Sequence, residues 1–151
     1  MLNTTLCYIE QDGKYLMLFR NKKKNDINEG KWVGIGGKFE PGETDDQCLL
    51  REVFEETGLT LTEYQKRGIV DFSLDKGFSE RMHLYTATGF TGTLTEECNE
   101  GELRWVEKEK VSELPRWEGD KIFMKKLLDG ESDFYLRLDY EGDKLVNVVM
   151  E

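Results

Sequence analysis

The chain has 151 residues, of which 31 are acidic and 21 basic, so its net charge is −10. This balance argues against a non-specific nucleic-acid binder, which needs an excess of positive charge, and the lack of a long apolar run argues against a transmembrane helix. The first residues hold no basic segment followed by an apolar stretch, and the 3 cysteines are widely spaced. We therefore expect one cytoplasmic domain, residues 1–151, with no signal peptide and no disulfide framework.

Short apolar runs bounded by turn residues predict a chain made mostly of strands. In chain order, we predict strands over residues 4–10, 15–19, 32–35, 64–74, 81–90, 102–106, 134–138 and 144–149. A polar loop is expected over residues 21–30, and helices are expected over residues 45–57 and 117–128. This order of elements predicts an α+β domain with a mixed β-sheet.

The first predicted helix has clear start and stop signals. The turn before it contains Pro41 and Gly42, two residues that favour tight turns. Thr44 can cap the helix N-terminus, and Gln47 completes a capping box with it. Gly58 is a natural C-terminal stop. These signals place the helix at residues 45–57.

Three carboxylates share one face of that helix. At about 100° per residue, Glu52, Glu55 and Glu56 fall within one arc. Apolar residues lie roughly opposite and are expected to pack on the core: Leu49, Leu50, Val53 and Phe54. The like charges repel, and a hard divalent cation such as Mg²⁺ or Mn²⁺ would offset that repulsion; a solvated acidic face is the alternative. Arg51 is spaced to pair with Glu55 and to reach back to Glu43, so we expect Arg51 and Glu43 to brace the loop and helix.

From Gly37, the spacing is G-x5-E-x7-R-E-U-x-E-E-x-G-U, where U is apolar. Chance would produce its fixed residues on the order of once in a hundred million windows. Residues 37–59 thus resemble the Nudix box, and the chain is similar to the Nudix hydrolases, which split nucleoside diphosphates linked to another group. The resemblance implies the Nudix fold, an α/β/α sandwich. The segments NDINEGKWVGIGGKFEPGET, CNEGELRW and PRWEGD extend the similarity to MutT-type members that hydrolyse oxidised purine nucleoside triphosphates, especially bacterial 8-oxo-dGTP diphosphatases.

Carried over by position, the resemblance implies a site for Mg²⁺, with Mn²⁺ as a possible substitute. Its ligands would be the main-chain carbonyl of Gly36 and the carboxylates of Glu52, Glu55, Glu56 and Glu100. Metal ions at the phosphates would neutralise charge on the leaving pyrophosphate and lower the pKa of a bound water. We predict that Glu52 takes the proton from that water, with Glu100 as the competing candidate.

For the substrate, the resemblance implies a phosphate contact from Lys23 and base recognition by Trp117 and Asp120. Stacking on an aromatic ring is worth roughly 1–3 kcal/mol per base, and an aspartate can accept hydrogen bonds from a guanine edge. Residues in and before the box are also expected to line the substrate site: Val33, Gly36, Gly37 and Lys38. From the residues alone, the alternatives are a solubilising lysine run, a core tryptophan and a first-turn aspartate that interacts with the helix dipole.

Two positions differ from the pattern of the oxidised-purine hydrolases. Val33 stands where some members carry Asn, and Gly119 stands where some carry the first of two acids. Both changes remove polar atoms from the expected pocket, and discrimination of a purine edge depends on paired polar groups. We therefore expect triphosphate hydrolysis to be retained, whereas selectivity for the 8-oxo base is the property that these changes affect.

Three functions are compatible with the sequence. The first is a nucleotide-pool sanitising pyrophosphohydrolase, a monomer or homodimer that acts on 8-oxo-dGTP or a related triphosphate, with neither a nucleic-acid polymer nor a membrane as partner. The second is a Nudix hydrolase of an unmodified nucleoside triphosphate, a dinucleoside polyphosphate or ADP-ribose. The third is a non-catalytic nucleotide sensor, which would not need the complete set of Arg51, Glu52, Glu55 and Glu56.

Overall fold

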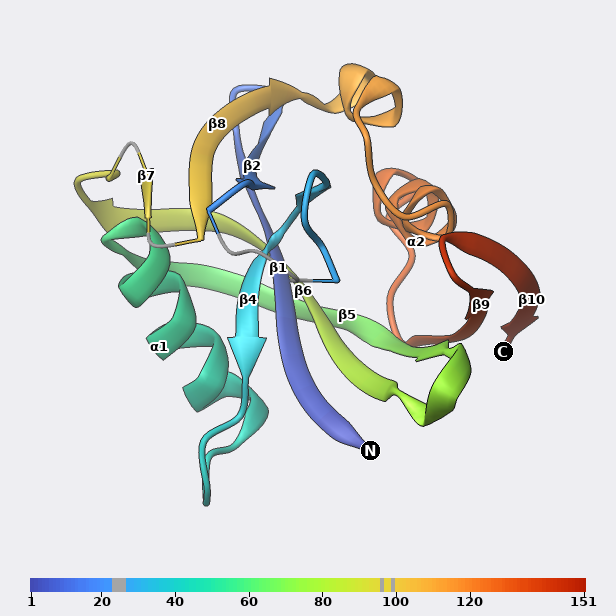
Figure 1. Cartoon of the computed structure of the whole chain (residues 1–151). Coiled ribbons are helices and arrows are strands. Elements are labelled where there is room, and N and C mark those ends of the chain that lie inside the picture. The colour runs from blue at the N-terminus through green and yellow to red at the C-terminus, as the bar shows by residue number, and fades with distance from the viewer. Residues whose placement is uncertain (23–26, 96, 99) are drawn as a thin grey trace.

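The computed structural model describes residues 1–22, 27–95, 97–98 and 100–151 (Figure 1). Its strands are β1 (Leu2–Gln11), β2 (Lys14–Arg20), β3 (Trp32–Val33), β4 (Ile35–Lys38), β5 (Leu59–Leu74), β6 (Ser79–Gly92), β7 (Glu97–Cys98), β8 (Gly101–Glu107), β9 (Phe134–Glu141) and β10 (Lys144–Met150). The helices are α1 (Asp45–Thr57), α2 (Asp120–Leu128) and the short 3-10 turns η1 (Asp75–Gly77) and η2 (Lys108–Glu113). None of the helices in these described ranges is long and apolar enough to cross a bilayer.

A mixed sheet runs through the molecule in the order β10-β9-β5-β6-β1, with β4 on the other side of β1. β1 is parallel to β6 and β5 is parallel to β9, whereas the other neighbours in this sheet are antiparallel. Beyond the turn at Asp12 and Gly13, β2 pairs with β3 and β8 in an antiparallel layer. The predicted α+β class with a mixed sheet is confirmed.

Successive residues of β1 face two different hydrophobic cores. Tyr8 joins the core that contains Phe123 of α2, whereas Ile9 joins the core that contains Val53 of α1. Side chains alternate between the two faces of a strand, so each face is covered by one helix. Figure 1 shows α1 and α2 on opposite sides of β1. This arrangement is the α/β/α sandwich that the resemblance implied.

Helix α1 begins and ends where its capping residues predicted. Thr44 Oγ1 accepts a hydrogen bond from the Gln47 amide at 3.2 Å, and Gln47 Oε1 accepts one from the Thr44 amide at 3.0 Å. Gly58 ends the helix at φ 79°, a left-handed conformation that glycine adopts without strain. These local contacts fix the helix relative to the loop that precedes it.

We expect Thr44→Ala to lower the free energy of unfolding by about 1 kcal/mol, because an N-terminal amide of α1 loses its hydrogen-bond acceptor. Urea denaturation of the variant beside the wild type measures this change. Thr44→Ser keeps the hydroxyl group and is the matched control. Equal stability of the alanine variant and the wild type would contradict the role of this cap.

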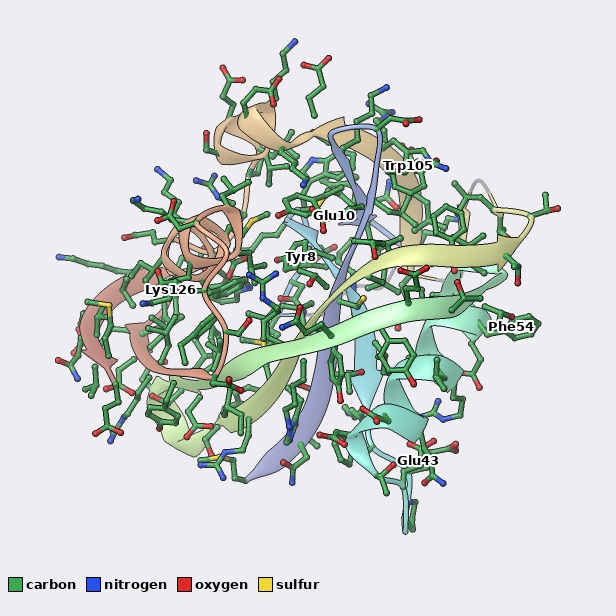
Figure 2. The ribbon with its side chains drawn as sticks, turned by 180° about the vertical axis from the view of Figure 1, so that it is seen from behind. Tyr8, Glu10, Glu43, Phe54, Trp105 and Lys126 are labelled. Carbon is green, nitrogen blue, oxygen red and sulfur yellow. The ribbon has the colours of Figure 1, made fainter. Side chains whose placement is uncertain are left out.

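The apolar face of α1 is narrower than its spacing predicted. Leu49 and Val53 are fully buried and Leu50 is partly buried, but Phe54 is 57% exposed and points away from the body of the protein (Figure 2). The prediction that Phe54 packs on the core is therefore wrong. Glu56 is buried instead of Phe54, because its position on the helix directs the carboxylate towards the backbone of β4.

Several elements also differ from the predictions in their bounds, and three of these differences have a clear structural basis. β5 begins at Leu59 rather than at residue 64. Its first residues pair with the end of β6 with shifts in register, and their polar side chains do not show the regular alternation that predicts a strand. The predicted strand 32–35 is divided into β3 and β4, because the chain changes its pairing partner from β2 to β1. α2 begins at Asp120, whose amide donates to the Trp117 carbonyl at 3.1 Å. Trp117 thus precedes the helix instead of starting it.

Candidate active site

Two glycines of β4 allow the backbone to approach its neighbours closely. A Cβ atom on Gly36 would lie 1.8 Å from the Thr5 carbonyl oxygen, and one on Gly37 would lie 2.4 Å from the Glu52 carboxyl group. Any side chain at Gly36 would therefore overlap the β1 backbone, and one at Gly37 would displace the carboxylate. Gly36 thus lets β4 lie close to β1, and Gly37 lets Glu52 lie directly against the β4 backbone.

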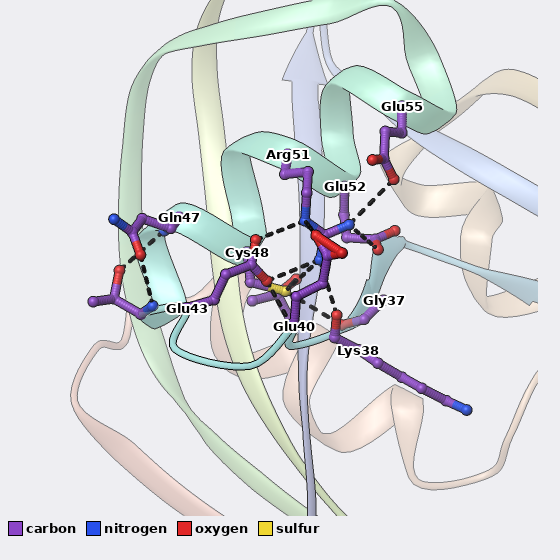
Figure 3. A network of polar contacts seen from close by, with 11 residues as sticks. Gly37, Lys38, Glu40, Glu43, Gln47, Cys48, Arg51, Glu52 and Glu55 are labelled. Atoms are coloured by element: carbon purple, nitrogen blue, oxygen red, sulfur yellow. Dashed lines mark hydrogen bonds and ion pairs between the residues drawn. The ribbon is translucent and has the colours of Figure 1, made fainter.

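Arg51 holds the carboxylates of the loop and of α1 together (Figure 3). Its Nε and Nη2 donate to the two Glu43 oxygens at 2.6 and 2.9 Å, while Nη1 donates to Glu52 at 2.8 Å and to Glu55 at 3.2 Å. Nη2 also donates to the Lys38 carbonyl oxygen at 3.0 Å. The hydrogen bonds from Arg51 lower the pKa of Glu43 to about 2. The contacts expected from the spacing, Arg51 to Glu55 and back to Glu43, are present.

Glu56 and Glu100 form a second acidic pair beside Gly36. Glu56 is 7% exposed, and its Oε2 accepts a hydrogen bond from the Gly36 amide at 3.1 Å. Glu100 lies in the turn between β7 and β8, with its Oε2 at 3.2 Å from Nη1 of Arg20. Burial and a hydrogen bond with the Glu100 carboxyl group together raise the pKa of Glu56 to about 11. The fold thus brings Glu100 to the acidic face of α1.

The residues present fit a hard divalent cation. Glu52, Glu56 and Glu100 offer oxygen atoms only, the ligands that Mg²⁺ and Mn²⁺ prefer. Metal ligands must be deprotonated, and a cation would favour the ionised forms of the paired acids Glu56 and Glu100. Within the described parts of the chain, no group of three or more Asp, Glu, His or Cys side chains is arranged closely enough to hold a metal ion. The individual ligands therefore stay a prediction.

One cavity of about 590 Å³ contains most of the predicted site. Its lining includes Val33, Gly36, Gly37, Lys38, Glu52, Glu100, Trp117 and Asp120. The predicted residues that do not line it are Glu43, Arg51, Glu55 and Glu56. The predicted phosphate contact Lys23 lies outside the described residues. Of the predicted carboxylates, Glu52 and Glu100 therefore open into the same space as the expected base-recognition residues.

Trp117 forms part of the cavity wall and of a hydrophobic core. Its ring lies 5.0 Å from that of Phe72 and 4.9 Å from that of Tyr140, both in edge-to-face geometry. The indole N–H donates to Asn28 Oδ1 at 2.7 Å, and Lys31 Nζ lies 4.4 Å from the ring centre. Only 6% of Trp117 is exposed. Trp117 thus packs in the core, as its apolar character predicted, and also lines the cavity. Its stacking on a base stays a prediction.

Asp120 is a buried acid at the start of α2. It is 7% exposed and lines the cavity, and no donor among the described residues forms a hydrogen bond with its carboxyl group. Burial raises the pKa of Asp120 to about 7, although the positive charges of Arg116 and Lys31 lower it. An acid in this environment can accept or donate a hydrogen bond near neutral pH.

The fold and the acidic face can be compared with known proteins. Residues 2–127 match the family model described as the NUDIX domain. The chain belongs to the Nudix family. The MutT protein of Bacillus halodurans has the same fold, with a TM-score of 0.87 and 29% identity over 100% of this chain and 98% of that one.

Two relatives extend the comparison in sequence. The uncharacterized Nudix hydrolase YvcI of Bacillus subtilis is 31% identical over 131 residues, which are 84% of this chain and 79% of that protein. The oxidized purine nucleoside triphosphate hydrolase of Danio rerio is 32% identical over 126 residues, which are 82% of this chain and 78% of that protein. The chain is therefore a MutT-like Nudix hydrolase, and enzymes of this family generally use divalent metal ions.

Four residues that line the cavity were not predicted as site residues from the sequence: Arg20, Asn28, Glu80 and Met82. Glu80 and Met82 alternate along β6, and Glu80 is directly opposite Phe72 of β5. Alternation alone could have placed Glu80 and Met82 on one face, but only the pairing of the strands shows that this face lines the cavity. Arg20, at the end of β2, carries no local signal for its position.

Proposed function

We propose that the chain is a Mg²⁺-dependent pyrophosphohydrolase of oxidised purine nucleoside triphosphates. Its main substrate would be 8-oxo-dGTP, cleaved to 8-oxo-dGMP and pyrophosphate, so that oxidised precursors leave the cytoplasmic nucleotide pool before DNA synthesis. One observation carries the proposal: a single cavity joins Glu52 and Glu100 to Trp117 and Asp120. The similarity to an oxidized purine nucleoside triphosphate hydrolase supports the substrate class.

The residues around the acidic face can perform the hydrolysis. A divalent cation held by the Gly36 carbonyl and the box glutamates would neutralise phosphate charge and lower the pKa of a bound water. Glu52 would take the proton from the water that attacks phosphorus, while pyrophosphate leaves with the electrons of the broken P–O bond. Arg51 Nη1 holds Glu52 in place by its hydrogen bond. Lys38 and Arg20 line this end of the cavity and bring positive charge to the phosphates.

The two departures from the oxidised-purine pattern have different consequences in the structure. Val33 lines the cavity and offers no polar atom to a base. At Gly119, a Cβ atom would lie 2.6 Å from Leu138 Cδ1 and 2.7 Å from the Tyr140 hydroxyl oxygen, which accepts a hydrogen bond from the Gly119 amide at 2.6 Å. A second acid there would have to displace the Leu138 and Tyr140 side chains. In this chain Asp120 would therefore recognise the purine edge without an acidic neighbour.

Product analysis with a substrate panel tests this function. Purified protein and Mg²⁺ are incubated with 8-oxo-dGTP, dGTP, a dinucleoside polyphosphate and ADP-ribose, and the products are separated by chromatography. We expect equal amounts of 8-oxo-dGMP and pyrophosphate, and no turnover with excess chelator. Release of orthophosphate from 8-oxo-dGTP, or a higher kcat/KM for ADP-ribose with two monophosphates as products, would assign another Nudix activity. Binding without turnover of any substrate would favour the sensor.

A further inference from the structure

Glu80 is a second carboxylic acid in the part of the cavity that contains the aromatic wall. It belongs to β6, lines the cavity and is partly buried. Thr4 Oγ1 donates a hydrogen bond to its Oε2 at 2.7 Å. This contact orients the carboxyl group and leaves the other oxygen, Oε1, for a further donor. Burial raises the pKa of Glu80, whereas this hydrogen bond and the charges of Lys38 and Arg20 lower it.

An aromatic wall connects Glu80 to Asp120. In the sheet, Glu80 of β6 is directly opposite Phe72 of β5, and the Phe72 ring packs against Trp117 at 5.0 Å. The Trp117 carbonyl in turn accepts the hydrogen bond from the Asp120 amide at 3.1 Å. All four residues line the cavity. A flat base that stacks on one of these two rings and contacts the edge of the other would thus have one carboxyl group towards each end.

A carboxyl group that is largely removed from water beside an aromatic wall destabilises a protein unless donors satisfy it. An apolar side chain at this position on β6 would pack beside Phe72 and Leu2 without that cost. Thr4 satisfies only part of the hydrogen-bonding capacity of Glu80. The geometry therefore suits a ligand that brings an N–H group to this end of the cavity.

We propose that Glu80 is a specificity-determining residue that accepts a hydrogen bond from the N7–H group of an 8-oxopurine, while Asp120 faces the N1–H and amino donors of the same base. The inference rests on the proposed function. Guanine carries a lone pair at N7, whereas 8-oxoguanine carries a hydrogen atom there. A carboxylate attracts the N7–H group of 8-oxoguanine and repels the N7 lone pair of guanine. Glu80 would therefore supply the discrimination between the two bases that Val33 cannot. Because both bases share the N1–H and amino donors, Asp120 would contribute affinity without discriminating between them.

Binding of the two product nucleotides separates these roles without requiring turnover. Dissociation constants for 8-oxo-dGMP and dGMP are measured by calorimetry for the wild type, Glu80→Met, Glu80→Gln and Asp120→Asn. We expect the wild type to prefer 8-oxo-dGMP about tenfold or more. Both Glu80 variants should lose that preference while they bind dGMP at least as tightly as the wild type does. Asp120→Asn should weaken both nucleotides by a similar factor and keep the preference.

The inference is overturned if Glu80→Met and Glu80→Gln keep the wild-type preference, or if the wild type has none. Retained dGMP binding shows that each variant is folded, and the glutamine variant keeps the shape of the side chain. If 8-oxo-dGTP yields pyrophosphate but the Glu80 variants keep the preference, only the role of Glu80 fails. If no triphosphate is hydrolysed although the binding preference depends on Glu80, the proposed function fails and the role of Glu80 in base binding stands.

Discussion

Glu52→Gln is expected to lower kcat for triphosphate hydrolysis by about 10²–10⁴-fold, the usual contribution of a positioned general base. The amide cannot take the proton from the attacking water, yet it has nearly the same size as the carboxylate. It can therefore keep the hydrogen bond from Arg51 and the close approach to Gly37. Nucleotide binding should change much less than kcat. Stopped-time pyrophosphate assays and calorimetry with a product nucleotide measure the two quantities.

Glu109→Gln is the matched control. Glu109 is exposed on η2, so this substitution removes the same charge at a position away from the cavity. It should keep wild-type kcat. A wild-type kcat in Glu52→Gln would contradict the assignment of Glu52. Glu100→Gln would then be the next variant to measure, since Glu100 lines the same cavity and is the competing base.

The second large effect concerns the pH dependence of stability at Asp120. Burial raises the pKa of Asp120 from 3.8 in a model peptide to about 7 in the folded protein. The folded state therefore holds this proton more tightly than the unfolded chain does, and the free energy of unfolding falls as pH rises from about 4 to about 7. At 1.36 kcal/mol per pKa unit, this group lowers stability by on the order of 4 kcal/mol across that range. Below about pH 4 its contribution is fully present.

Asp120→Asn should remove this loss, because an amide does not ionise. The groups that face Asp120 are the charged Arg116 and Lys31 and the hydroxyls of Tyr8 and Tyr140. The effects of the two charges are already included in the pKa of about 7. Urea denaturation at pH 5 and pH 8 should show the variant gaining stability over the wild type by a few kcal/mol at the higher pH. The same difference at both values would contradict a buried acid.

Asp75→Asn provides the control for this measurement. Asp75 is exposed in η1, far along the chain from α2, and its substitution makes the same chemical change without removing a buried group. Its stability relative to the wild type should depend little on pH. A parallel pH-dependent gain in both variants would point to net charge rather than to the burial of Asp120.

Local signals were enough to predict the elements whose ends are set by neighbouring residues. The capping box of Thr44 and Gln47 and the stop at Gly58 gave α1 its bounds. The start of α2 was placed too early, because Trp117 has the helical spacing of the following residues but packs on Phe72 and Tyr140. Periodicity could not distinguish a core contact made by α2 from one made by the segment before it.

The same limit applies to the site. Arg51, Glu52, Glu55 and Glu56 lie within one helix, so their shared face follows from helical geometry alone. Their meeting with Glu100 was predicted only through the family resemblance, because the turn between β7 and β8 reaches α1 through tertiary structure. Glu80 and Arg20 had no local motif and were missed, and Asn28 was not chosen as a site residue although it lies in the quoted segment NDINEGKW. Their positions depend on strand pairing and on contacts between distant segments.

The most direct test of the account is kcat/KM for 8-oxo-dGTP and dGTP, measured side by side with Mg²⁺ and pyrophosphate detection. We expect a preference of about tenfold or more for the oxidised nucleotide, which corresponds to about 1.4 kcal/mol in the transition state. Equal values, or a preference for dGTP, would contradict the sanitising role while leaving a Nudix hydrolase with a different substrate.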